Sequence, residues 1–452
     1  MRRLWIGLGI LFVLLVAGVV GLNLWVHAYL RSDAFRQLIS AKTGETLHID
    51  AEYQPLDWSG SSVYSSSLKG VGESGAPLES LDAEQVRANV DWKAIFDGVW
   101  RVSRADIVRL DVKIRSATER VATAQEPGPT PMPAPPKKSF LPNRFQLDII
   151  SVQDANLSVG NLAQTQHSAL TMRPEGNGWI FDGTGGRLEL ANRAPLEIGN
   201  FRVRLQQGVV YLTDSTLRLG ESGAIQATGE VGGVGAPFDI RLAWQGVSSA
   251  DVLDAEWKER LSGVISGDAH SMGREKKPPV TRGHFQLTDG MLKGLPVQSK
   301  IAKFTQTPQF ERMPLQTVSG DYSYDGTTLI VTNFVLESQG LLRVEGDCTT
   351  GANDSITGTF QVGVTSQSLQ WLPGSQEKVF VTSRNGYLWT TVNVSGTLQN
   401  PVEDLSDRLA RAMGEQVIDT GMKLIEDAPE KATKKAGDTV DKVLDILTPL
   451  IP

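Results

Sequence analysis

The chain has 452 residues, which is enough for two or three domains. Its 51 acidic and 44 basic residues give a net charge of −7, which argues against a nucleic-acid partner, because phosphates are bound by Lys and Arg. Hydrophobic residues make up 40% and charged residues 21%, a balance that excludes global disorder. Cys348 is the single cysteine, which excludes an internal disulfide and any multi-cysteine metal site, and we expect neither a metal nor a cofactor.

Residues 1–30 are predicted to form a transmembrane anchor. No charged residue occurs between Leu4 and Val26, and ~20 helical residues at ~1.5 Å each match the ~30 Å hydrocarbon core of a bilayer. Arg2 and Arg3 precede this stretch, which favours a cytoplasmic amino terminus and an exported body. A cleaved signal peptide ending near Ala28 is the alternative. The residues expected in the bilayer are Leu4, Trp5, Phe12, Leu15, Val20, Leu22 and Trp25.

Residues 31–120 are expected to mix helix and strand. Ser32-Asp33 is typical of a helix start and Gly44 of a helix end, and a second, short helix is expected at 92–96. Apolar and charged residues then alternate without exception over residues 108–115, which predicts a strand with one apolar and one hydrated face.

Residues 121–142 interrupt this pattern. The segment holds seven prolines, which cannot donate to a strand ladder. We predict an extended linker or a long excursion at a sheet edge, with a proline-motif ligand for a partner as the alternative.

Residues 143–400 are predicted to form a β-rich body. Short alternating stretches recur, as at 201–205 and 238–242, and their regular spacing favours antiparallel strands. A faint repeat, in which Asp and a second apolar run follow a strand, occurs at 152–157, 212–217 and 287–292. The predicted turns are Asp182-Gly183, Asp289-Gly290, Asp325-Gly326 and Asn385-Gly386.

Residues 401–452 change to a helical period, with an apolar stripe that includes Leu405 and Leu409. The segment carries seven basic and eleven acidic residues, whereas helices that bind anionic membranes are rich in Lys and Arg. We expect amphipathic helices that cover the β-rich body, with docking of a partner protein or a membrane contact as alternatives.

Motifs that would indicate an enzyme are missing. Residues 70–75 match the dinucleotide fingerprint by letter, but Pro77 follows where the motif requires a helix, so a glycine-rich turn is the better interpretation. There is no phosphate-binding Walker sequence and no nucleophile elbow. Cys348 has no histidine near it in sequence, which favours an inert buried thiol. We therefore expect no catalytic residues and no enzymatic activity.

The apolar faces of the strands carry the remaining functional signal. Few helical residues are predicted between 143 and 400 to cover these faces, which leaves two solutions. One is a closed sandwich or barrel, and the other is a long curled sheet whose apolar face forms a groove for acyl chains. The candidate groove residues are Val108, Leu110, Val112, Ile114, Phe201, Val203, Leu205, Phe238, Ile240 and Leu242.

Five segments occur in a recognisable order: 32–44, 81–92, 107–112, 320–326 with the sequence GDYSYDG, and 395–401 with the sequence SGTLQNP. Together with the anchor, this order resembles the AsmA-like family of bacterial envelope proteins, within the chorein-like, bridge-type lipid-transfer superfamily. The resemblance covers about half of the chain and rests on apolar positions and turns.

The resemblance implies a single-pass inner-membrane protein whose body lies in the periplasm. It implies a phospholipid or other acyl lipid as ligand, an apolar β-groove, and a role in lipid transport or outer-membrane homeostasis, with no catalytic residues to carry over. The alternative is a non-enzymatic envelope scaffold or assembly factor with a closed β core and a partner-binding carboxy-terminal helix.

Overall fold

The computed structural model describes residues 28–73, 76–115, 144–161, 163–191, 194–232, 236–253, 255–274, 277–294, 308–370, 372, 374–397, 401–412 and 414. Nearly all of the expected anchor, the whole proline-rich segment and most of the expected carboxy-terminal helices lie outside these residues. Among the helices that the structure does describe, none has the length and apolar character needed to cross a bilayer. The chain divides into two compact units, one up to Arg218 and one from Leu219 onward.

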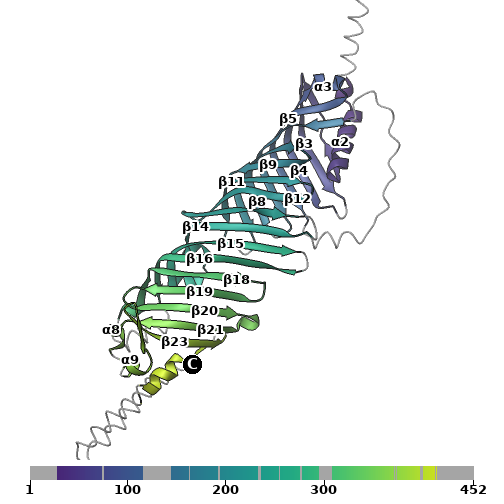
Figure 1. Ribbon diagram of the computed structural model, residues 1–452. Coiled ribbons are helices and arrows are strands. Elements are labelled where there is room, and N and C mark those ends of the chain that lie inside the picture. Colours follow the sequence, from purple (N-terminus) through teal and green to yellow (C-terminus); the bar gives the residue numbers. More distant parts are fainter. Residues whose placement is uncertain are drawn as a thin grey trace, which may run out of the picture. The chain divides into compact units, whose positions relative to one another are not determined.

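The first unit consists mainly of strands, with two helices near its start (Figure 1). Its elements are α2 (Asp33–Leu47), β1 (Ile49–Tyr53), β2 (Asp57–Ser59), β3 (Ser62–Gly72), β4 (Leu78–Asp91), α3 (Trp92–Phe96), β5 (Val99–Ile114), β6 (Arg144–Leu147), β7 (Ile150–Val159), β8 (Ala163–Glu175), β9 (Gly178–Thr184), β10 (Arg187–Leu190), β11 (Leu196–Gln206) and β12 (Val209–Leu219).

One hydrogen-bonded sheet contains these strands. The long strands β3, β4, β5, β7 and β8 lie side by side in this order. The shorter strands β9 and β10 each pair with β8 on one side and with β11 on the other. Strand β11 in turn pairs with β12. The short strands β1 and β2 pair with β3. A mainly β fold is therefore confirmed.

The sheet of the first unit is mixed, so the expectation of a purely antiparallel sheet is wrong at β5. This strand runs parallel to β7, with Ile107 opposite Val152, and parallel to β6, with Val99 opposite Arg144. Parallel neighbours need a connection of about a dozen residues or more. The proline-rich segment belongs to the connection between β5 and β6. This connection returns the chain from the end of β5 to the beginning of β5, where β6 pairs with it in the same sheet.

The second unit is also mainly β and carries short helices between its strands. Its elements are β13 (Gly223–Val231), β14 (Phe238–Ser248), α5 (Ser249–Val252), α6 (Ala255–Arg260), β15 (Leu261–Arg274), β16 (Lys277–Lys293), η1 (Pro308–Glu311), β17 (Arg312–Leu315), β18 (Thr317–Tyr324), β19 (Leu329–Ser338), β20 (Leu342–Thr350), η2 (Ala352–Asp354), β21 (Ile356–Val364), α8 (Ser366–Leu369), α9 (Ser375–Lys378), β22 (Thr382–Arg384), β23 (Tyr387–Gly396) and β24 (Pro401–Glu403).

All strand pairs described in the second unit are antiparallel. The order runs from β13 through β14, β15 and β16 to β18, β19, β20, β21 and β23, with β17, β22 and β24 as short additions. Residues 405–412 then form a helix. The described strands of each unit form one sheet, so the second sheet that the sandwich alternative requires does not occur among the described residues.

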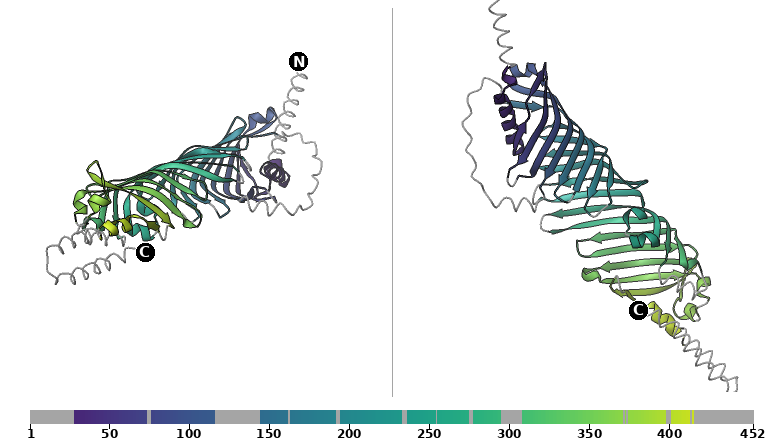
Figure 2. Two further views of the ribbon diagram at one scale, coloured as in Figure 1. Left: turned by 60° about the horizontal axis from the view of Figure 1, so that its bottom comes forward. Right: turned by 180° about the vertical axis from the view of Figure 1, so that it is seen from behind.

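The faint sequence repeat corresponds to irregularities in β7, β12 and β16. In each copy an Asp lies two positions after one apolar residue and just before a small one, as in Leu287, Asp289 and Gly290. The pairing register shifts at these places, and Asp289 has a φ of 51°. Such bulges bend a strand and increase its twist. Figure 2 shows strands of both units that are bent along their length.

Two of the predicted turns are wrong for the same reason. Asp182-Gly183 lies inside β9 and Asp289-Gly290 lies inside β16, so neither pair ends its strand. Asp325-Gly326 and Asn385-Gly386 do connect consecutive strands, and both residues of the second pair have positive φ. Helix α2 begins as predicted, with Ser32 accepting a hydrogen bond from the Phe35 amide, but it continues beyond Gly44 to Leu47.

Candidate functional site

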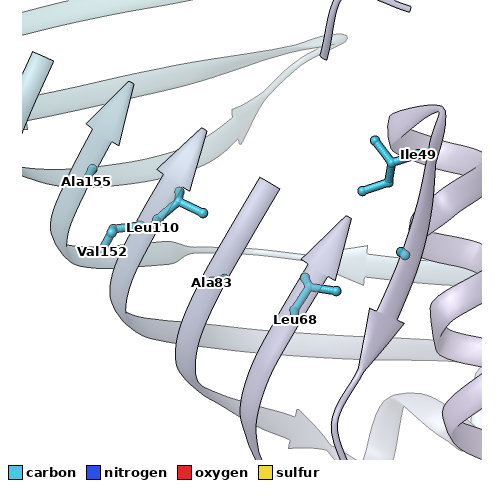
Figure 3. Close-up of a cluster of buried hydrophobic side chains, with 7 residues drawn as sticks. Ile49, Leu68, Ala83, Leu110, Val152 and Ala155 are labelled. Atoms are coloured by element: carbon cyan, nitrogen blue, oxygen red, sulfur yellow. The ribbon is translucent and has the colours of Figure 1, made fainter. Parts of the chain in front are cut away.

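An apolar face is built from residues that pair across neighbouring strands. In the first unit Leu68 lies opposite Ala83, Ala83 opposite Leu110, and Leu110 opposite Ala155. Paired residues share one face of a sheet. Together with Ile49 they belong to one buried cluster, and Figure 3 shows them side by side on consecutive strands.

Three of the four residues predicted on β5 lie on this face, and Val108 does not. Leu110 is buried in the cluster and Val112 packs against it. Ile107, which alternation places on the opposite face, also packs against the cluster, while Val108 is exposed. The exchange extends over the neighbouring strands, because Ile107 and Leu110 pair with Val86 and Ala83 of β4 and with Val152 and Ala155 of β7, which are also three positions apart. Gln85, between Ala83 and Val86, has a φ of 54°.

The other predicted residues continue the same pattern. On β11, Phe201, Val203 and Leu205 pair with Gly183, Phe181 and Trp179 of β9, respectively. On β14, Phe238, Ile240 and Leu242 share a face with Trp244 and pair with the small residues Gly273, Ser271 and Ala269 of β15. Alternation therefore assigned these two strands correctly. The predicted groove residues do not include Trp244 of β14 or Phe285 of β16, although the alternation of apolar residues along each strand also applies to them.

The apolar face carries no charged side chain among the described residues of β1 to β12, or of β13 to β21 and β23. The pairing registers place only Gly, Ala, Val, Leu, Ile, Met, Phe, Trp, Tyr, Pro, Ser, Thr or Cys on it. A face of this composition offers apolar contact and a few hydroxyls, but no ionic partner for a ligand.

The opposite face carries the ionisable side chains, several of which contact one another. The contacts include Arg101 with Asp148 at 2.8 Å, His270 with Asp239 at 2.9 Å, and His284 with Asp321 at 3.0 Å. Hydrogen bonds from Asn333 and His284 hold the pKa of Asp321 below its ordinary value. These side chains are partly or fully exposed, so this face is hydrated.

The helices that the structure describes cover parts of the apolar face. In the first unit α2 contributes Phe35, Leu38 and Ile39 to a cluster with Trp58 and Trp100. The Trp58 Nε1 donates to the Leu30 carbonyl at 2.9 Å, which ties the chain before α2 to the sheet.

A second covered area lies in the second unit, around α8 and α9. Leu369 and Phe380 from this region pack with Val364 of β21, and Leu405 and Leu409 of the helix at 405–412 pack against them. The described start of the carboxy-terminal segment thus lies on the β-rich body, as the covering-helix interpretation expects. A third cluster joins η1 and β17 to β16, β18 and β19.

Phe201, Phe238, Ile240 and Leu242 belong to none of these covered clusters. Leu242 is 36% exposed, whereas Trp100 is 3% exposed. A cavity of about 450 Å³ also opens in the first unit, but most of its lining residues, including the charged Lys69, Asp82, Asp111 and Lys113, belong to the opposite, hydrated face.

Cys348, the one cysteine of the chain, pairs with Val331 and Gly358 on the apolar face. Burial and the nearby Asp347 raise the pKa of the Cys348 thiol, so it is protonated near neutral pH and a poor nucleophile. The part of the chain that the structure describes has no group of three or more His, Cys, Asp or Glu placed to hold a metal ion.

Comparison of the chain with family models, with curated proteins and with solved structures finds no match in any of the three.

Proposed function

We propose that this protein is a membrane-anchored envelope protein that binds acyl lipid on its apolar face, which serves as an open groove. The proposal rests on one observation above all: in each unit a face without charged residues extends over the described strands, and Phe238, Ile240 and Leu242 of this face belong to none of the clusters that the described helices cover. Contiguous uncovered apolar surface of this kind marks a binding site or an interface.

The ligand class follows from the chemistry of the face. An acyl chain gains roughly 0.8 kcal/mol for each methylene removed from water, and it needs no polar partner. A charged headgroup gains nothing from a face that has no charged side chain, and burying it there unpaired is costly. We therefore expect the chains to lie on the apolar face and the headgroup to stay in water at its rim.

The cellular role is proposed from the resemblance to AsmA-like proteins. Residues 1–30 would anchor the chain in the inner membrane, and the body would act in the periplasm as a non-enzymatic carrier or partial bridge for phospholipid. Outer-membrane homeostasis is the process that such transfer would serve.

The test is the lipid content of the full chain purified from membranes, measured by native mass spectrometry. We expect the wild-type protein to retain acyl lipid. The double substitution Ile240→Asp and Leu242→Asp places two charges on the apolar face and should abolish retention. The matched control, Gln226→Asp and Thr228→Asp, places two charges on exposed positions of the opposite face of β13 and should leave it unchanged. Wild-type protein without lipid in repeated preparations would refute the proposal.

The scaffold alternative makes a different prediction. If residues 402–452 dock a partner, their deletion should remove that partner from the purified complex and leave the lipid content as it was. If they only cover the body, the deletion should change stability or lipid content without the loss of a partner protein.

A further inference from the structure

Aromatic rings on the apolar face lie over glycines of the neighbouring strand. In the first unit Phe201 of β11 pairs with Gly183 of β9, and in the second unit Phe238 of β14 pairs with Gly273 of β15. A Cβ atom built on either glycine would overlap the paired ring. The ring therefore occupies the space that any other residue's side chain would take.

The same arrangement forms a row across four strands. Trp244 of β14 lies opposite Gly267 of β15, Gly267 opposite Phe285 of β16, and Phe285 opposite Gly320 of β18. A Cβ on Gly267 would come within 2.8 Å of the Trp244 ring, and one on Gly320 within 3.1 Å of the Phe285 ring. Aromatic residues and glycines thus alternate along the row.

Backbone conformation does not explain glycine at these positions. Gly183, Gly267, Gly273 and Gly320 all lack the positive φ that would favour glycine. Glycine inside a strand is otherwise unfavourable, because it loses more conformational freedom on folding and has no side chain to pack. At Gly183 and Gly273 the atoms nearest to the built Cβ are all ring atoms, so the space beneath the ring is what an added side chain would fill.

The consequence is geometric. Carbon atoms in contact stay about 3.5–4.0 Å apart, so a methyl group beneath a ring would lift or turn the ring away from the sheet. With glycine beneath it the ring can lie close to the sheet.

We infer that these ring-over-glycine pairs set the depth of the lipid groove and thereby determine how much acyl chain it accepts. This inference rests on the proposed function and assigns a specificity role to Gly183, Gly273 and Gly320. Replacement of such a glycine would raise its ring into the path of the chain, without adding any charge.

The test uses the pair Gly273 and Phe238 in the full-length protein. Binding of fluorescently labelled palmitic acid and the lipid retained on purification are measured for Gly273→Val, for Phe238→Ala and for the double variant. Gly273→Val should weaken binding about tenfold, or about 1.4 kcal/mol, and the double variant should recover most of the loss because the raised ring is gone. Ala243→Val, on the opposite face of β14, is the control for an added side chain of the same size.

The outcomes separate the two claims. Equal binding by wild type and Gly273→Val, with both folded by circular dichroism, would refute the depth role and leave the lipid function standing. Loss of binding in Gly273→Val without recovery in the double variant would also refute it, since removal of the ring should then have restored the space. Repetition with Gly183→Val and Phe201→Ala provides an independent pair in the other unit. A wild-type protein that binds no lipid would refute both proposals.

Discussion

Trp100 and Leu242 lie on apolar faces of the same composition but in opposite surroundings. Trp100 packs against Phe35 of helix α2, with ring centroids 5.5 Å apart, and is 3% exposed. Leu242 lies outside every helix-covered cluster and is 36% exposed. The strands alone create an uncharged face, and helices such as α2 and the one at 405–412 determine which parts of it become an ordinary core. The proposed ligand would bind on the parts that these helices leave exposed.

The largest predicted effect contrasts these two positions directly. Trp100→Ala should destabilise the first unit by about 3–5 kcal/mol, the usual cost of removing a large buried aromatic side chain. Leu242→Ala should cost about 1 kcal/mol or less in lipid-free protein, because much of the side chain already contacts water. Thermal and urea unfolding followed by circular dichroism measure both. Equal costs would mean that Leu242 is covered in solution.

A smaller effect is expected where the carboxy-terminal segment meets the edge of the sheet. Arg408 donates to the Thr391 carbonyl and the Thr390 hydroxyl, both at 2.5 Å, and Asp404 accepts from the Asn393 amide at 3.0 Å. These contacts satisfy polar groups of β23 where neither β22 nor β24 pairs with it.

Arg408→Ala should therefore destabilise the covered area around α8 and α9 by about 1 kcal/mol. Hydrogen exchange of β23 amides should rise by a corresponding factor. Arg408→Lys is the matched control, which keeps the charge but not the fork of donors, and we expect an intermediate result. Unchanged exchange in Arg408→Ala would show that the helix at 405–412 does not protect this edge.

A pH dependence should distinguish the area near α2. The Tyr53 hydroxyl lies 3.3 Å from Thr43 Oγ1 of α2, and burial raises the pKa of Tyr53 above its ordinary value, while the Thr43 contact acts in the opposite direction. The neutral phenol is favoured in the folded state. Its contribution is therefore complete below the unfolded-state pKa of about 10 and is lost as the pH rises through the folded-state pKa.

We therefore expect the unfolding temperature of the wild type to fall more steeply above pH ~10 than that of Tyr53→Phe. Tyr64→Phe, which removes a phenol from an exposed position, is the control and should follow the wild type. Burial and the charge of Asp268 also raise the pKa of Tyr322, which contributes equally to all three proteins. Parallel curves for wild type and Tyr53→Phe would contradict the prediction.

The smallest effect is expected on the hydrated face. Arg241 lies 3.5 Å from Asp239, and its side chain is mostly exposed, so Arg241→Gln should change stability by less than about 1 kcal/mol. Lipid retention should not change either, because Arg241 lies on the opposite face from Ile240 and Leu242. A loss of lipid as large as that predicted for charges on the apolar face would contradict the distinction between the two faces.

The sequence was most informative where a strict period of two is maintained. Alternation placed Phe201, Val203 and Leu205 on one face of β11, and Phe238, Ile240 and Leu242 on one face of β14, as the structure confirms. The error at Val108 has a physical origin, since β4, β5 and β7 share an irregularity at this place, which puts Ile107 on the apolar face instead of Val108. The repeated Asp was visible in the sequence, but its effect on a neighbouring strand depends on pairing.

The ring-over-glycine pairs were even less accessible from the sequence. Gly183 was interpreted as part of a turn, because an Asp-Gly pair between apolar runs is typical of a hairpin. Its partner Phe201 is distant along the chain, and only the register of β9 with β11 brings the two together. No local pattern identifies which glycine of a strand lies beneath an aromatic ring.

The sequence by itself determined a mainly β chain with alternating apolar and charged positions, because side chains in a strand point to opposite faces in turn. Tertiary contacts determine that β5 and β7 run parallel, that the described strands of each unit form one sheet, and which parts of the apolar face the described helices cover. The reason is physical: a period is local, whereas strand register, bulges and cover arise from contacts between residues far apart in the chain.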